Sequence, residues 1–225
     1  MTTDTPDLGR VYPFSPSQRG TSREHRNLRH ELARSTRAKF AESETVRADT
    51  LEVQRAQIVA CAIALAEAVA AGSTIFTFGN GSCSTDASEL ALLFSTRAPE
   101  PRLSACAAVA LTDDTAALSA LAEDVGYERA IAQQLEALGE HGDIAIGFCS
   151  AAPPRNVVAA YRTARRLGML SVGFCGPSRA GDDDVVVDHR IGVDSTSVYR
   201  VEEAHTALYH VLWELVGLAR SLTMP

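Results

Sequence analysis

The stretch STIFTFGNGSCSTDASELALLF, residues 73–94, predicts a strand, a turn and a helix in close succession. Its apolar run at 74–79 is short and rich in β-prone residues, which predicts a buried strand. The segment 86–95 carries apolar residues at helical spacing and predicts a helix. A strand followed closely by a helix is the repeating unit of an α/β domain.

The turn inside this stretch carries the first sign of function. Gly79 and Gly81 allow backbone angles that other residues avoid, and Thr85 or Asp86 can cap the helix that follows. The amides of such a turn, in front of a helix N-terminus, form a site for an anion such as phosphate. Gly-Asn-Gly also closes ordinary turns, so the turn alone leaves both interpretations open.

The rest of the chain repeats the pattern. Further strands are predicted at 106–111, 144–149, 170–176 and 185–193, and helices at 115–121, 127–138, 155–167 and 198–222. Short buried strands that alternate with helices predict a three-layer α/β sandwich with a parallel sheet. Ligands bind such sheets beyond the carboxyl ends of the strands, which here means the turns at 79–86, 112–115 and 149–156.

The N-terminal region has a different composition. We assign residues 1–40 to a basic arm that includes the start of a first helix, and residues 41–225 to the α/β domain. A second helix is expected from about Thr50 to Ala71, ended by Gly72. The arm can meet an acidic partner or form a solvated basic face. Its basic residues are Arg10, Arg19, Arg23, Arg26, Arg29, Arg34, Arg37 and Lys39.

Composition narrows the class of protein. The net charge of −7 over 225 residues argues against a nucleic-acid-binding surface that covers the molecule. No window approaches 18 continuous apolar residues, and the polar N-terminus has no signal-peptide pattern, so we expect a cytoplasmic protein without a membrane partner. The 5 cysteines form no CxxC pair and are interpreted as reduced core residues.

Longer motifs give a family resemblance. The segments FGNGSCSTDASELA, ALTDDTAALSALAEDVGYERAIAQQLEALGEHGDIAIGF, NVVAAYRTARRLGMLSVGFCG and YRVEEAHTALYHVLWELV follow one another in order. From about Leu51 to the C-terminus the chain resembles the sugar isomerase (SIS) domain of the sedoheptulose-7-phosphate isomerases, or phosphoheptose isomerases. The resemblance implies a five-stranded, flavodoxin-like parallel sheet preceded by N-terminal helices, a homotetramer, and a phosphorylated sugar as substrate.

The resemblance also implies a reaction. In the family an aldose and a ketose interconvert through an enediol, with a carboxylate and a histidine as the acid–base pair and often a zinc ion beside the sugar. His210 matches the catalytic histidine. Leu93 occupies the position of the usual carboxylate, and Glu89 stands one turn earlier, where a histidine is usual. We therefore expect His210 and Glu89 to be catalytic, and Glu89, Glu202 and His210 to be the candidate metal ligands.

Other matches mark the expected substrate site. Ser82 and Cys83 replace a glycine and a serine of the family, and only Ser150 keeps a hydroxyl in the third turn, where Arg155 can supply charge. Glu202 replaces a glutamine. The expected substrate-binding residues are Asn80, Gly81, Ser82, Cys83, Asp86, Arg97, Glu123, Asp124, Ser150, Arg155 and Glu202.

Two functions compete at this point. The first is a phosphosugar isomerase in which Glu89 or Glu202 replaces the missing carboxylate. The second is a non-catalytic SIS protein that binds a sugar phosphate or a protein partner as a regulatory or adaptor subunit. Without a site around them, His210 would be a packed histidine between helices and Glu89 a solvated residue of an amphipathic helix.

Overall fold

The computed structural model describes residues 22–96, 105–177 and 187–223. Its centre is a five-stranded sheet in which every neighbouring pair is parallel, in the order β2-β1-β3-β4-β5. This is the flavodoxin-like order, so the predicted fold class is confirmed. The strands are β1 Ile75–Gly79, β2 Ala108–Ala110, β3 Ile144–Cys149, β4 Leu170–Cys175 and β5 His189–Gly192.

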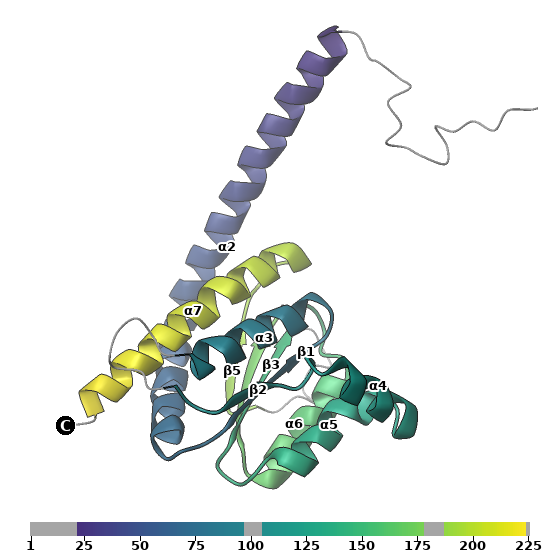
Figure 1. Ribbon diagram of the computed structural model, residues 1–225. Coiled ribbons are helices and arrows are strands. Elements are labelled where there is room, and N and C mark those ends of the chain that lie inside the picture. Colours follow the sequence, from purple (N-terminus) through teal and green to yellow (C-terminus); the bar gives the residue numbers. More distant parts are fainter. Residues whose placement is uncertain (1–21, 97–104, 178–186, 224–225) are drawn as a thin grey trace, which may run out of the picture. The chain divides into compact units, whose positions relative to one another are not determined.

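Helices cover both faces of the sheet (Figure 1). One core cluster joins α2, α3 and α7 to side chains such as Ile144, Ile146 and Phe148. The second joins α5 and α6 to Phe76 and Phe78 on the opposite face. Both faces of the sheet are buried, so consecutive side chains of a strand are mostly apolar and its sequence is a nearly continuous apolar run. The helices are α2 Ser22–Ala70, α3 Ser82–Ser95, α4 Thr115–Asp124, α5 Tyr127–Leu138, α6 Arg155–Leu167 and α7 Val198–Thr223.

The expectation of two N-terminal helices was wrong. Residues Ser22–Ala70 form one α2 helix of 49 residues. The segment contains neither glycine nor proline, so nothing in it interrupts the backbone hydrogen bonds. Gly72, with φ +92°, follows its end. The chain divides into two compact units, residues 1–42 and residues 43–225, and the second contains the sheet.

By length and composition alone, α2 could cross a membrane. A core helix of a soluble protein passes the same test, so this is weak evidence. Here Ile58, Cys61 and Leu65 are buried in the core cluster beside the sheet.

The first turn differs from its prediction in one respect. Helix α3 begins at Ser82, not at Asp86, and Gly81 with φ +57° is its N-cap without a side-chain capping bond. Gly79 has no room for a side chain, because a Cβ there would lie 2.5 Å from the carbonyl oxygen of Cys83. The two glycines bring the helix N-terminus directly against the end of β1, which places Asp86 inside the helix instead of at its cap.

Candidate active site

The turns after β1 and β3 meet at the point where the strand order reverses. Asn80 follows β1 and Asn156 lies in the first turn of α6. Their side-chain amides bond reciprocally, at 2.9 Å from Asn80 Nδ2 to Asn156 Oδ1 and 2.8 Å in the other direction. The Tyr127 hydroxyl also donates to Asn80 Oδ1 at 2.9 Å. This network fixes the two loops where ligands bind in doubly wound sheets.

The N-terminus of α3 carries the predicted anion turn. The amides of Cys83 and Ser84 donate to the carbonyls of Asn80 and Gly81 at 3.1 Å, so they close the turn itself. The Ser82 hydroxyl donates to Glu202 Oε1 at 2.5 Å. A carboxylate from α7 therefore lies at this helix N-terminus, where negative charge is favoured.

Cys83 and Ser150 come together across the same edge of the sheet. The Cys83 side chain is buried, and burial raises the pKa of its thiol, while hydrogen bonds with Ser150 act in the opposite direction. The thiol is thus a protonated, weakly polar part of the turn.

A second group of polar side chains joins α3 to α7. His210 Nε2 lies 3.4 Å from Glu89 Oε1. His210 Nδ1 lies 2.7 Å from the Thr206 carbonyl oxygen, which can only accept, so Nδ1 carries the hydrogen. The Tyr209 hydroxyl donates to Glu89 Oε2 at 2.6 Å. The structure thus brings the two expected catalytic residues together, with Nε2 facing the carboxylate.

Asp86 adds a second carboxyl group near this pair. Burial raises the pKa of Asp86 to about 6, and the charges of Glu202 and Glu89 act in the same direction. The Thr206 hydroxyl lies 3.4 Å from Asp86 Oδ1 and opposes the shift. Asp86 therefore holds its proton more readily than a solvated aspartate, as expected for a carboxyl group that is largely removed from water and lies near other carboxylates.

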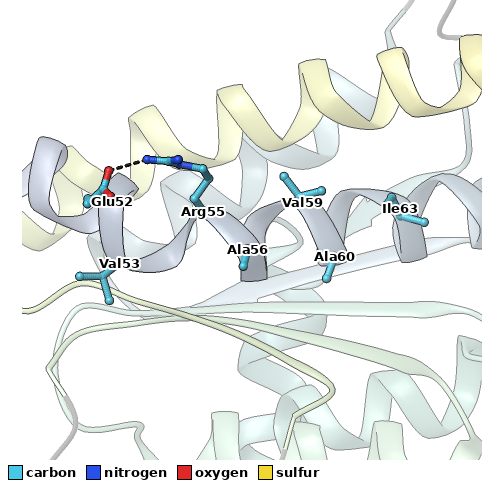
Figure 2. A pocket seen from close by; sticks show the side chains of 7 residues that line it. All are labelled: Glu52, Val53, Arg55, Ala56, Val59, Ala60 and Ile63. Atoms are coloured by element: carbon cyan, nitrogen blue, oxygen red, sulfur yellow. Dashed lines mark hydrogen bonds and ion pairs between the residues drawn. The ribbon is translucent and has the colours of Figure 1, made fainter.

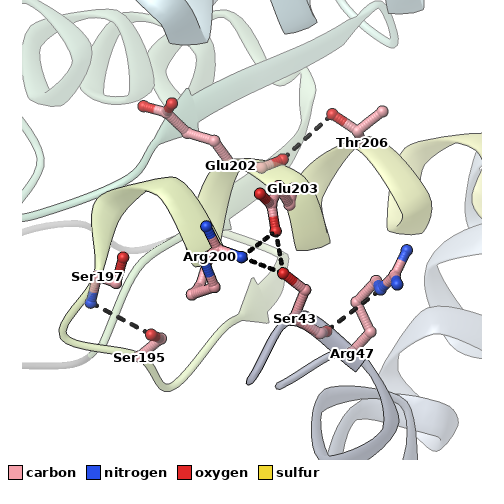
Figure 3. Close-up of polar contacts among 8 residues, drawn as sticks. All are labelled: Ser43, Arg47, Ser195, Ser197, Arg200, Glu202, Glu203 and Thr206. Carbon is pink, nitrogen blue, oxygen red and sulfur yellow. Dashed lines mark hydrogen bonds and ion pairs between the residues drawn. The ribbon is translucent and has the colours of Figure 1, made fainter. Parts of the chain in front are cut away.

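The N-terminal part of α7, which carries Glu202, is anchored to α2 (Figure 3). The Ser43 hydroxyl donates to Glu203 Oε2 at 2.5 Å, and Arg200 lies 3.0 Å from the same carboxylate. Arg200 also contacts the Ser43 hydroxyl. Ser43 is buried, so α2 fixes the end of the helix that presents Glu202 and, two turns later, His210.

The remaining expected site residues lie elsewhere. Glu123 and Asp124 are exposed at the C-terminal end of α4. Arg155 is exposed at the start of α6, 3.6 Å from Glu128. Within the described part of the chain these contacts do not join them to Glu89 or His210. Arg97 lies outside the described residues.

The expected metal ligands do not form one group. Glu89 and His210 face each other, whereas Glu202 is bonded to Ser82. Among residues 22–96, 105–177 and 187–223, no three His, Cys, Asp or Glu side chains are placed to hold a metal ion. The donor set therefore does not fit a zinc ion in this arrangement, and no chemical step is assigned to a metal.

Comparison with known proteins agrees with this architecture. The family model of the SIS domain matches residues 40–176. This chain belongs to the SIS domain family. The phosphoheptose isomerase of Roseiflexus sp. (strain RS-1) is 38% identical over 174 residues, 76% of this chain and 86% of that protein. The one of Thermodesulfovibrio yellowstonii is 35% identical over 187 residues, 83% of this chain and 92% of that protein.

A solved structure extends the agreement to three dimensions. The phosphoheptose isomerase from Neisseria gonorrhoeae matches this SIS domain with a TM-score of 0.75 at 26% identity, covering 82% of this chain and 98% of that one. The family resemblance drawn from the motifs is confirmed.

Sequence reasoning missed several polar residues of this SIS domain. Tyr209, Thr206, Asn156 and Tyr127 all bond to expected site residues. A signal existed for Tyr209 and Thr206, because they lie next to His210 and one turn before it on the same helix. Nothing in the sequence indicated that Asn156 and Tyr127 would meet Asn80, since that contact depends on how three loops pack.

Proposed function

We propose that this chain is an aldose–ketose isomerase that acts on a phosphorylated sugar of the sedoheptulose 7-phosphate type. Its SIS-family relatives named phosphoheptose isomerase favour this function over the non-catalytic alternative. The observation that carries the proposal is the Glu89–His210 pair, whose facing atoms on α3 and α7 are 3.4 Å apart.

The reaction needs groups that move protons between neighbouring atoms. A base removes the proton from the carbon next to the carbonyl, which gives an enediol, and the proton returns to the neighbouring carbon. We assign the removal and return of the carbon-bound proton to the Glu89 carboxylate. His210 Nε2 exchanges a proton with the substrate oxygens, because its Nδ1 is committed to the Thr206 carbonyl. Both side chains keep solvent access, 46% for Glu89 and 39% for His210.

The β1–α3 turn is proposed to hold the rest of the substrate. Asn80, Ser82 and Ser150 offer hydrogen bonds, with Gly81, Cys83 and Asp86 shaping the turn around them. Glu202 now accepts from Ser82, so a phosphate that takes the Ser82 hydroxyl must first displace this carboxylate. A displaced Glu202 is a suitable acceptor for sugar hydroxyls.

A turnover assay tests the function. The unaltered protein, with and without added zinc, is expected to convert sedoheptulose 7-phosphate or another seven- or eight-carbon ketose phosphate to its aldose. Glu89→Gln and His210→Gln should each lower kcat by roughly 100-fold or more, the range for general acid–base groups. Glu140→Gln, a change of an exposed glutamate before β3, is the matched control. Absence of turnover on the whole panel would contradict the function.

Assembly as a homotetramer is a further part of the proposal. The α2 helix presents an outward apolar strip of Val53, Ala56, Val59, Ala60 and Ile63, bordered by the Glu52–Arg55 ion pair (Figure 2). The exposed fractions are 77% for Val53, 46% for Val59 and 47% for Ile63. Repeats of three and four residues between these positions are typical of helices that pack on another copy.

Two other assignments complete the proposal. We place the protein in the cytoplasm, which subcellular fractionation tests, and we take residues 41–225 as the SIS domain, with the basic segment 1–40 outside it. Metal analysis of protein purified without added metal, repeated on Glu89→Gln, tests separately whether zinc occupies the predicted ligands.

A further inference from the structure

Tyr209 is held rigidly behind the Glu89–His210 pair. Its ring is fully buried in α7. It meets the Phe148 ring of β3 edge to face, with centroids 5.9 Å apart at 87°. It also stacks on the His210 ring at 4.7 Å and 28°. A ring packed on two sides keeps one rotamer, so the position of its hydroxyl is set by the core.

The hydroxyl uses this fixed position to hold a carboxylate. It donates to Glu89 Oε2 at 2.6 Å, which leaves Oε1 directed at His210 Nε2 at 3.4 Å. Glu89 has three side-chain torsions and is half-exposed, so alone it would sample many orientations. An O–H donor to a carboxylate makes a short, strong bond that selects one of them.

We infer that Tyr209 is a positioning residue: its buried hydroxyl holds the Glu89 carboxylate in the orientation in which the other oxygen and His210 Nε2 face the same place. The inference rests on the proposed function. Within the described residues, the titratable groups that interact with Glu89 are Asp86 on the same helix and Tyr209 and His210 on α7. Among these, Tyr209 and His210 contact the carboxylate.

Positioning predicts an effect on the chemical step and not on substrate binding. Tyr209→Phe removes only the oxygen and keeps the packing against Phe148 and His210. We expect kcat to fall roughly 10- to 100-fold, as misplacement of a reacting group by about an ångström does, while KM stays within about twofold. Tyr199→Phe is the matched control, because this tyrosine of α7 is 69% exposed.

The double variant separates positioning from general stabilisation. In Glu89→Gln protein, the Tyr209→Phe change should cause little further loss of kcat, since both changes disable the same group. If the unaltered protein converts the substrate and the Tyr209→Phe variant does so with the same kcat, this inference is overturned and the proposed function is not. The inference is also overturned if Tyr209→Phe lowers kcat by the same factor in the unaltered protein and in the Glu89→Gln protein, and also raises KM and lowers Tm. No turnover by the unaltered protein would overturn the proposed function together with the inference.

Discussion

At the level of single residues, His205 is an ionisable group with no exposed surface. It is fully buried, and its ring packs edge to face against Phe148 and Phe174. Its Nε2 lies 3.3 Å from the Cys175 carbonyl oxygen, and its Nδ1 has no hydrogen-bond partner within the described part of the chain. Burial lowers the pKa of His205 from 6.5 to about 4, so the ring is neutral in the folded protein near pH 7.

This residue makes stability depend on pH. Between pH 6.5 and about 4 the unfolded chain binds a proton at His205 that the folded chain does not, so the stability falls as the pH falls through this window. Its slope there is at most about 1.4 kcal/mol per pH unit. Replacement of His205 by Phe should flatten the dependence, measured by urea unfolding at pH 7.0 and at about pH 4.5. An unchanged difference between the two pH values would contradict the assignment.

The sequence allowed single site residues to be predicted, but not the contacts between them. His210 and Glu89 were recognisable because each belongs to a motif of fixed spacing along a helix. Their contact was not, because it joins α3 to α7 across 120 or so residues of chain, and the register between two helices is set by packing. Leu93 is half-buried against the core cluster in this protein, a role that agrees with its apolar side chain.

At the level of elements, the bounds of strands and helices were predicted well where glycines or apolar runs mark the ends of the elements. Helices α5 and α6 and strand β3 have the expected bounds. The errors fall where the signal is weak. The sequence of α2 has no glycine or proline that marks a helix end, and the expected break between two helices is not there. The start of α3 depends on a glycine with positive φ and not on a side-chain cap.

The junction of β1 and α3 gives a prediction at this scale. An alanine at Gly79 would place its Cβ 2.5 Å from the carbonyl oxygen and 2.7 Å from the carbonyl carbon of Cys83, both parts of the backbone. Helix α3 must then move away from the strand. We expect Gly79→Ala to lower the free energy of unfolding by about 1–3 kcal/mol and to reduce kcat as well. Wild-type stability and turnover in this variant would contradict the close approach.

At the scale of the whole molecule, the apolar strip on α2 predicts the effect of a charge on assembly. Val59→Glu places a carboxylate among Val53, Ala60 and Ile63, where a second copy is proposed to pack. Light scattering after size-exclusion chromatography should show a species smaller than the proposed tetramer. Leu138→Glu, at a 55% exposed position on α5, is the matched control. The same oligomer for both variants would contradict packing through α2.

The central claim is that Glu89 moves a carbon-bound proton of a phosphorylated sugar with the help of His210. The most direct measurement is the incorporation of solvent deuterium into sedoheptulose 7-phosphate at the carbon next to the carbonyl, followed by NMR in D₂O. The unaltered protein should introduce deuterium together with isomerisation, and Glu89→Gln should introduce it at least about 100-fold more slowly. Equal rates for the two proteins, or no incorporation by either, would contradict the claim.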